Sequence, residues 1–526
     1  MFLREIKSKG KTYLNIIQGY REGGKVKQKS VISFGCIDKL NKEQLKKLGS
    51  SLIKYCNSQV LMDVNTIEEK SRKNWGAVRL LQKIWKMYDL SGLINHLSND
   101  SKIEFDVCNT IFLMLIDRLL DPKSKLKSYE EQKRYYEVED VELHHLYRAL
   151  DFLYKHKEEI EIHLFEQSKK LFNLSVDVVL YDVTTLYFES NHSDELRNFG
   201  YSKDCKFNEV QVVLSLLVDR EGIPIGFELY EGKKFEGKTL IDIIEKVKNK
   251  FKINKIIFIA DQGMLSKDNL TVIKDNEFEY IIGSRIRSKS KKIKEQVLNA
   301  ENYITVSKEN EEIFKYKEIE IGEDKIICSW SKKRANKDRK DRARLLLKAE
   351  KLLKGGINKL ITSRGAGKYI DISSQTTAQI NNEKIQRDEQ WDGYFAIQTN
   401  SKINDQEKLL EYYHQLWKVE ESFRLFKSHL ETRPMFHWNS SRINGHMVLC
   451  FLSFLFERTL EFKLRQNSIE YSADKIRQAL NSLEFSEISI ENKTFYLRAP
   501  VEGLAYQLLK IFNIRMPKSM SRPDEF

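Results

Sequence analysis

The stretch Val176–Glu189, with the sequence VDVVLYDVTTLYFE, decides the fold of this chain. It is short, apolar, and rich in β-branched and aromatic residues, a pattern that predicts a buried strand. Asp182 interrupts the apolar run. A buried charge costs free energy unless it is paired or binds a cation. The same stretch therefore predicts a sheet core and a candidate functional carboxylate.

Strands and helices alternate after this stretch. Residues 210–219 (VQVVLSLLVD) and 223–232 (IPIGFELYEG) predict a hairpin. A helical pattern at 238–251, a strand at 255–260 (KIIFIA), a helix-like segment and a strand at 278–285 follow. This order predicts a mixed α/β sheet. Asp261 directly follows the run KIIFIA, at the edge of the sheet where α/β folds usually place ligands.

A third candidate carboxylate lies on a long predicted helix, which begins at Asn404 or Asp405 and ends before Pro434. One stripe of this helix carries residues spaced 3, 4, 4 and 3 apart: Tyr413, Leu416, Glu420, Arg424 and Lys427. Glu421 is rotated about 100° away from the stripe. A solvated face with a Glu420–Arg424 pair is the alternative interpretation. Flanking apolar residues favour an enclosed helix.

These carboxylates predict a particular chemistry. Without a His or Cys cluster, three carboxylates suit hard cations such as Mg²⁺ or Mn²⁺. Two such ions can hold the attacking and leaving oxygens of a phosphoryl transfer. That reaction also needs cations near the phosphate, and Arg424 and Lys427 share the stripe of Glu420.

Three motifs in order resemble those of DDE-type insertion-sequence transposases: YDVTTLYFE, IADQG, and Y-x2-L-x3-E-x6-K, which resembles the YREK signature. The resemblance covers roughly residues 174–460. It assigns the catalytic, metal-holding acids to Asp182, Asp261 and Glu420, and DNA-phosphate contacts to Tyr413 and Lys427. Leu416 stands where that signature has Arg, and Arg424, one turn beyond Glu420, is the candidate substitute.

The resemblance implies a ribonuclease-H-like mixed-sheet core interrupted by a β-rich insertion. The 159 residues that separate Asp261 from Glu420 leave room for that insertion. The expected organisation is an N-terminal β-hairpin segment (1–40), a helical module for DNA-end binding (41–172), the first core part (173–284), a basic β-rich insertion (285–400), the second core part with the catalytic Glu helix (401–460), and a helical C-terminal tail (461–526).

Two basic runs lie inside the expected insertion. Residues 285–294 carry six basic residues and no acid, and residues 332–344 carry eight basic residues and two acids. We expect phosphate contacts from Arg285, Arg287, Lys332, Lys333 and Arg334. A solvated helix face is a nearly equal alternative for the second run.

Composition excludes several classes of protein. The 526 residues carry a net charge of +13, which permits a polyanionic partner, and 41% hydrophobic residues, which excludes a disordered chain. The six cysteines form no C-x-x-C pair, as expected of a reduced cytoplasmic protein. The longest apolar run, 447–456, is too short to span a membrane and predicts a buried helix. We expect a bacterial, nucleoid-associated protein with no membrane partner.

The leading hypothesis is a transposase that cuts double-stranded DNA at terminal inverted repeats and transfers the freed strand into target DNA. The resemblance implies two Mg²⁺ or Mn²⁺ ions as cofactors and a homodimer in the DNA complex. Two alternatives stay open: a ribonuclease-H-like DNA nuclease without strand transfer, and a catalytically inactive DNA-binding protein.

Overall fold

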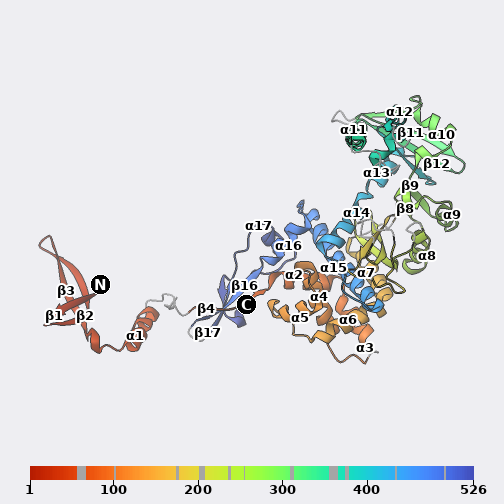
Figure 1. Ribbon diagram of the computed structural model, residues 1–526. Helices are drawn as coiled ribbons and strands as arrows, with labels where there is room; N and C mark the ends of the chain where they lie inside the picture. Colours follow the sequence, from red (N-terminus) through yellow and green to blue (C-terminus); the bar gives the residue numbers. More distant parts are fainter. Residues whose placement is uncertain are drawn as a thin grey trace. The chain divides into compact units, whose positions relative to one another are not determined.

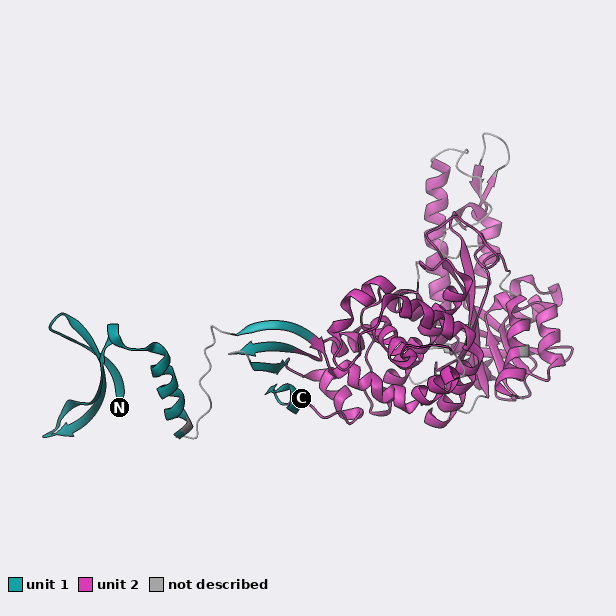
Figure 2. Ribbon diagram, turned by 90° about the horizontal axis from the view of Figure 1, so that it is seen from below, with its two compact units in different colours: residues 1–72, 486–498, 518–526 teal, residues 73–485, 499–517 magenta. Residues whose placement is uncertain are grey.

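The structure is a computed structural model that describes residues 1–55, 67–99, 102–172, 177–200, 208–234, 238–253, 255–307, 313–354, 365–372, 378–432, 435–490 and 493–526. Cys56, Cys205 and Pro434 lie outside these ranges. The chain divides into two compact units (Figure 2): residues 1–72, 486–498 and 518–526 form the first, and residues 73–485 and 499–517 form the second.

The first unit contains an N-terminal sheet of β1 (Phe2–Ser8), β2 (Lys11–Glu22) and β3 (Lys25–Cys36), followed by α1 (Lys42–Tyr55). Glu22 pairs with Lys25 across the turn, and both turn residues have positive φ, +56° at Gly23 and +77° at Gly24. A two-residue turn of this kind needs positive φ at both positions, which glycine adopts without strain. The predicted hairpin is confirmed, with β1 added to it.

A second sheet in this unit has the order β18-β17-β16-β4. It unites β4 (Glu68–Asn74) with three C-terminal strands: β16 (Glu484–Ile490), β17 (Lys493–Arg498) and β18 (Met520–Ser521). Only helices were expected in the two regions that supply these strands, residues 41–172 and 461–526. The sequence EEKSRKN of β4 is highly charged and carries no strand-like alternation, so only its distant partner strand reveals it.

The second unit begins with the helical module: α2 (Gly76–Met87), α3 (Leu90–Asn99), α4 (Val107–Leu120), α5 (Lys125–Glu131), α6 (Leu143–Lys155) and α7 (Lys157–Phe172). Both α4 and α6 pack on the long helix α15 (Ser440–Gln466). A Cβ at Gly445 would lie 1.9 Å from the carbonyl oxygen of Leu150, so only glycine permits the close approach of α6.

Residues 447–456 are buried within α15, which confirms the predicted buried helix. No helix among the described residues is both long and apolar enough to cross a membrane. Two shorter helices, α16 (Ala473–Asn481) and α17 (Gly503–Ile511), follow along the chain.

The core of the second unit is a nine-stranded sheet with the order β10-β11-β12-β15-β9-β8-β5-β6-β7. Figure 1 labels β8 and β9, together with β11 and β12. Five strands form the expected core: β5 (Val178–Tyr187), β6 (Gln211–Asp219), β7 (Pro224–Glu231), β8 (Ile257–Ala260) and β9 (Glu279–Gly283). The strands β5, β8 and β9 run parallel, β6 pairs antiparallel with β5, and β7 pairs antiparallel with β6. This is the ribonuclease-H-like arrangement that the motif order implied.

The insertion continues the same sheet. Its strands β10 (Ile304–Ser307), β11 (Ile313–Ile321) and β12 (Asp324–Ser331) join the core through β15 (Tyr394–Thr399), which pairs with β9. The insertion also contains α10 (Lys291–Leu298), α11 (Lys332–Lys354), β13 (Ile370–Ile372), β14 (Ala378–Ile380) and α12 (Asn382–Glu389). The second basic run lies on α11, and Arg342 within it is buried.

Helices cover both faces of the core strands. One face packs on α8 (Thr239–Phe251) and α9 (Lys267–Asp275) through a buried apolar cluster. Two further helices contact the same strands: α13 (Gln406–His414) contacts β8 and β9, and α14 (Trp417–Arg424) contacts β5 and β6. Asp405 caps α13 by accepting a 2.9 Å hydrogen bond from the Lys408 N–H, as predicted.

The predicted single helix is divided. The N–H of Gln415 donates to the carbonyls of both Glu411 and Tyr412, and the buried Leu416 precedes the first residue of α14. This tight turn lets α13 and α14 contact different strands of the sheet. A short π-helix at Leu425–His429 then follows α14.

Candidate active site at the carboxyl edge of the sheet

Asp182 and Asp261 occupy adjacent positions on neighbouring parallel strands. The last paired residues of β5 and β8 are Tyr181 and Ala260, and the two aspartates directly follow them. Neighbouring strands lie about 4.8 Å apart, so the two carboxylates emerge side by side. Tyr181 and Ala260 both belong to the apolar cluster beneath α8. Because strand side chains alternate between faces, Asp182 points to the opposite face of the sheet, where α14 lies.

Each aspartate makes the same kind of local hydrogen bond. In each, Oδ1 accepts a hydrogen bond from the N–H of the next residue, at 2.7 Å for Asp182 and 2.6 Å for Asp261. Asp182 is half-buried within β5, whereas Asp261 is exposed and caps a short 3-10 turn. The local backbone thus orients both carboxylates at the end of the apolar strands.

Glu420 and Glu421 have different environments, although they are neighbours on α14. Glu420 is exposed, and its carboxylate forms no ion pair with any residue in the described part of the chain. Glu421 is half-buried and lies 3.4 Å from the guanidinium of the buried Arg458 and 3.5 Å from that of Arg424. The charge of Glu421 is therefore balanced within the fold, and that of Glu420 is not.

The three acids all act on the pKa of Tyr413. Burial raises the pKa of its hydroxyl, and the carboxylates of Asp261, Glu420 and Asp182 raise it further, while Arg334 opposes them. The hydroxyl also lies against the backbone of β9, since a Cβ at Gly283 would be 2.5 Å from it. Tyr413 is therefore a protonated hydrogen-bond donor beside the acids at neutral pH.

A cavity of about 300 Å³ opens beside Asp261. Tyr413 and three of the predicted phosphate contacts, Arg285, Arg287 and Arg334, line it together with Asp261. The Arg334 guanidinium stacks 4.9 Å from the ring centroid of Phe395, and Arg287 lies 2.9 Å from Asp388. The core and the insertion thus both contribute to this cavity.

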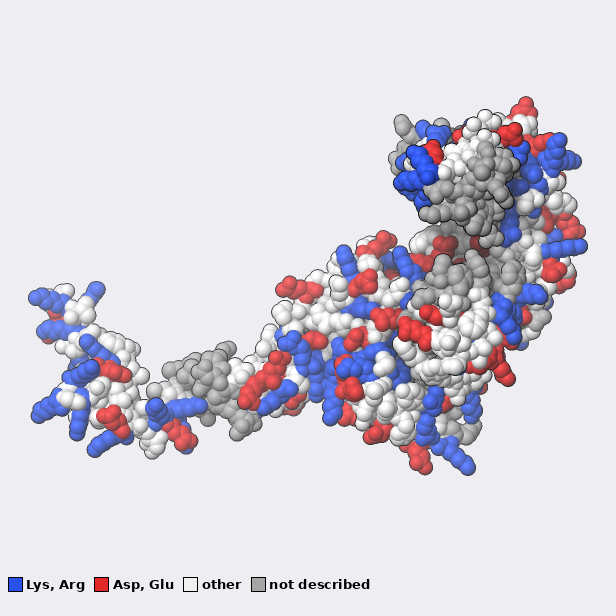
Figure 3. Space-filling view, in the orientation of Figure 1, with Lys and Arg blue, Asp and Glu red and all other residues white. Residues whose placement is uncertain are grey.

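The remaining predicted contacts lie elsewhere. Lys333 lines a neighbouring cavity together with Arg334, and Lys332 is exposed at the start of α11, where Figure 3 shows basic side chains gathered. Arg424 is exposed, and Lys427 is half-buried on the π-helix. None of these four lines the cavity beside Asp261.

Sequence reasoning missed an ionic cluster inside the insertion, which we name the clasp: Arg342, Glu389 and Asp392. The Arg342 guanidinium donates two hydrogen bonds to Asp392, at 2.5 and 2.8 Å, and one to Glu389 at 3.2 Å. Nearby, Asp338 accepts a 3.0 Å bond from the Gly393 N–H. The clasp fixes the basic helix α11 to the start of β15, within reach of the cavity.

The acids offer only carboxylate oxygens, the donor type that Mg²⁺ and Mn²⁺ prefer. As they stand, no three acidic, His or Cys side chains of the described ranges are close enough together to enclose a metal ion. The donor type nevertheless fits a divalent cation.

One further acid and three tryptophans are structural or exposed. Asp219 Oδ1 accepts hydrogen bonds from the N–H groups of Glu221 and Ile223, at 2.9 and 2.7 Å, so Asp219 is a turn residue. Trp391 is buried, whereas Trp417 and Trp438 are exposed.

Comparison with known proteins gives the family. The transposase DDE domain family matches residues 175–455, more than half of the chain, and the N-terminal domain of IS1634 family transposases matches residues 3–62. No curated protein of similar sequence was found.

Similar solved structures include the piggyBac transposase synaptic complex with hairpin DNA, at 9% identity and a TM-score of 0.36, over 77% of this chain and 78% of that one. The Mos1 transposase paired-end complex with the left transposon end is 12% identical over 46% of this chain and 77% of its own, with a TM-score of 0.15. These likenesses are weak, and the family assignment rests on the sequence matches. Those matches span the strands, the insertion and the helix that carry Asp182, Asp261 and Glu420. The chain belongs to the DDE transposases of insertion sequences.

Proposed function

We propose that this transposase cuts double-stranded DNA at the terminal inverted repeats of its element and joins the freed ends to target DNA. The observation that carries the proposal is the register of β5 and β8, which sets Asp182 beside Asp261 beneath the helices of Tyr413 and Glu420. In the first step water attacks a phosphodiester and releases a 3′-hydroxyl. In the second step that hydroxyl attacks a target phosphodiester and displaces the target's own 3′-oxygen.

Asp182, Asp261 and Glu420 would hold the divalent ions, Mg²⁺ or Mn²⁺ and two in number. When bound, such ions activate the attacking oxygen and neutralise charge on the phosphate. The Tyr413 hydroxyl, kept protonated by its surroundings, donates a hydrogen bond to a phosphate oxygen.

Cationic side chains bind the DNA backbone in this proposal. Arg285, Arg287 and Arg334 line the cavity beside Asp261 and contact phosphates near the cut, and Lys332 and Lys333 extend this surface along α11. Arg424 and Lys427 contact phosphates from the helix of Glu420. Leu416 occupies the position where the YREK signature has Arg, and it is buried. Arg424 makes the phosphate contact of that Arg instead.

The proposed division of labour follows the domains expected from sequence. The helical module within 41–172 binds the terminal repeats, and two copies of the chain pair two ends in one complex. The segments 173–284 and 401–460 carry the catalytic core, and 285–400 is the insertion.

The test uses a labelled terminal-repeat duplex and a supercoiled target plasmid. The wild-type protein with Mg²⁺ is expected to nick the duplex at the repeat boundary and to join a pre-cleaved end to the plasmid. Nicking without joining would favour the nuclease alternative. Binding with neither reaction would favour the inactive DNA-binding protein.

A further inference from the structure

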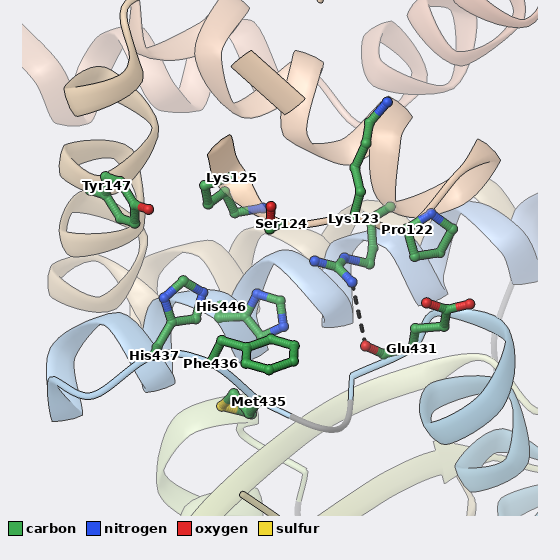
Figure 4. Close-up of a pocket in the computed structure, with 11 residues that line it drawn as sticks. Pro122, Lys123, Ser124, Lys125, Tyr147, Glu431, Met435, Phe436, His437 and His446 are labelled. Carbon is green, nitrogen blue, oxygen red and sulfur yellow. Dashed lines mark hydrogen bonds between the residues drawn. The ribbon is translucent and has the colours of Figure 1, made fainter. Parts of the chain in front are cut away.

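A second cavity, of about 200 Å³, lies between the helical module and the segment that links the π-helix to α15. Its lining includes Arg118, Ser124 and Lys125 from the helical module and His437 and His446 from the C-terminal side (Figure 4). A water molecule occupies about 30 Å³ of liquid, so the cavity has room for a small ligand. None of the residues proposed for DNA cleavage lines it.

Three side chains that line this cavity are buried and cationic or polar. Arg118, Lys125 and His446 are 6%, 4% and 5% exposed. Arg118 Nη1 donates to the carbonyl oxygen of Leu430 at 3.1 Å, but among the described residues neither its Nε nor Nδ1 of His446 has a hydrogen-bond partner. Lys125 forms no ion pair with any carboxylate in the described ranges. Buried polar groups without partners are costly, so a ligand that accepts hydrogen bonds would repay them.

The nearby carboxylate of Asp117 is engaged through Oδ1, while its buried Oδ2 has no hydrogen-bond partner among the described residues. Asp117 accepts a 2.7 Å hydrogen bond from the Tyr135 hydroxyl and lies 3.1 Å from the ammonium of Lys123. Lys123 points away from the cavity in Figure 4, as this pairing requires. Glu431 lines the cavity but is exposed to solvent. The enclosed part of the lining is therefore positively charged.

The titration of these groups agrees with an excess of positive charge. Burial and the Arg118 guanidinium lower the pKa of Lys125 to about 7, while Asp117 opposes this shift. Burial, Lys125 and Arg118 lower the pKa of His437 to about 3. Burial and the same cations also hold the pKa of His446 well below its usual value. The imidazole rings of His437 and His446 are therefore neutral at physiological pH. A bound cation would add to this repulsion, whereas an anion relieves it.

We propose that this cavity binds a phosphate group. The guanidinium of Arg118 and the ammonium of Lys125 supply charge-assisted hydrogen bonds to its oxygens, and His446 Nδ1 supplies a further polar contact. Ser124 contributes a hydroxyl donor at the rim, because its Oγ already accepts a 3.2 Å bond from the Lys127 N–H. The site does not depend on the proposed DNA cleavage, because it lies on other residues.

The experiment measures binding of inorganic phosphate to the full-length protein by calorimetry, near pH 6.5 in a chloride buffer. Wild-type protein is expected to bind phosphate, and Lys125→Met to bind it about tenfold to a hundredfold more weakly, because one charge-assisted contact is lost. The matched control is Lys127→Met on the same helix, whose exposed ammonium pairs with Glu131 at 2.9 Å and should leave binding unchanged. Without phosphate, Lys125→Met should melt no lower than wild type, because it removes a desolvated charge.

A second arm identifies the source of the phosphate. If the natural occupant belongs to the DNA backbone, inorganic phosphate competes with a terminal-repeat duplex, and Lys125→Met weakens duplex binding. If the occupant is a free ion, duplex binding is the same in both proteins while phosphate binding differs. The proposal is overturned if wild-type protein binds no phosphate at millimolar concentration and Lys125→Met leaves duplex binding unchanged. It is also overturned if both proteins bind phosphate equally.

Discussion

The carboxyl edge of the core sheet and the clasp of the insertion use the same kinds of charged residue in opposite ways. In the clasp, the buried Arg342 is neutralised by Asp392 and Glu389 through three hydrogen bonds. At the edge, the carboxylates of Asp261 and Glu420 are exposed and form no ion pair with any described residue. Charge that the chain balances itself holds the fold, and charge that it leaves unbalanced is available to ligands.

The largest expected effect concerns the edge. Asp182→Asn, Asp261→Asn or Glu420→Gln should slow strand cleavage by about a thousandfold or more, because each removes a ligand of the ions that stabilise the transition state. Cleavage of an end-containing duplex is the measurement. Terminal-repeat binding in the absence of metal should stay within about twofold of wild type, since these acids do not contact DNA themselves. Wild-type cleavage in any one of the three would remove that residue from the site.

Breaking the clasp should lower the free energy of unfolding. Arg342→Ala leaves the half-buried Asp392 without its partner, which costs about 3 kcal/mol of unfolding free energy. Urea denaturation measures this loss. Arg344→Ala is the control, because that side chain is 76% exposed on the same helix and should change stability by less than about 0.5 kcal/mol. Equal effects in the two variants would mean that the clasp does not hold the insertion.

Arg334 lies where the two regions meet, and its effect should appear in DNA affinity. Arg334→Ala is expected to weaken binding to all duplexes alike and to lower the slope of log K against log salt by about 1, the value for one phosphate contact. Binding isotherms at several salt concentrations give this slope. An unchanged slope would mean that Arg334 makes no phosphate contact.

The smallest effect is expected at Glu421, which distinguishes neighbouring glutamates on one helix. Glu421→Gln should change the cleavage rate by less than about twofold, because the side chain faces Arg458 and Arg458 retains Glu461 at 2.5 Å. The same assay that tests Glu420→Gln measures it. A loss as large as that of Glu420→Gln would reverse the assignment of the catalytic glutamate.

The core could be predicted because its signals are local. The apolar runs before Asp182 and Asp261 specify strands by themselves, and the helical spacing from Tyr413 to Lys427 places these residues on neighbouring turns. The break at Leu416 could not be predicted, because it depends on which strands α13 and α14 contact. The predicted roles of the site residues stay predictions until the variants are measured.

The missed features depend on residues far apart in the chain. Arg342 and Asp392 are 50 positions apart, and the phosphate cavity joins Arg118 to His446. In the sequence each of these appears as an ordinary charged or polar residue on a helix. The strand β4 was missed for the same reason, since its partners lie at the other end of the chain.

The unbroken pairing from β7 to β10 has a consequence for how such an element can diversify. Strand spacing is set by backbone hydrogen bonds, so the distance from the aspartates to β12, which leads into α11, does not depend on loop length. New surface can be added at the outer strand β10 without moving Asp182 and Asp261. The sheet thus permits a changing outer surface beside two aspartates whose positions stay fixed.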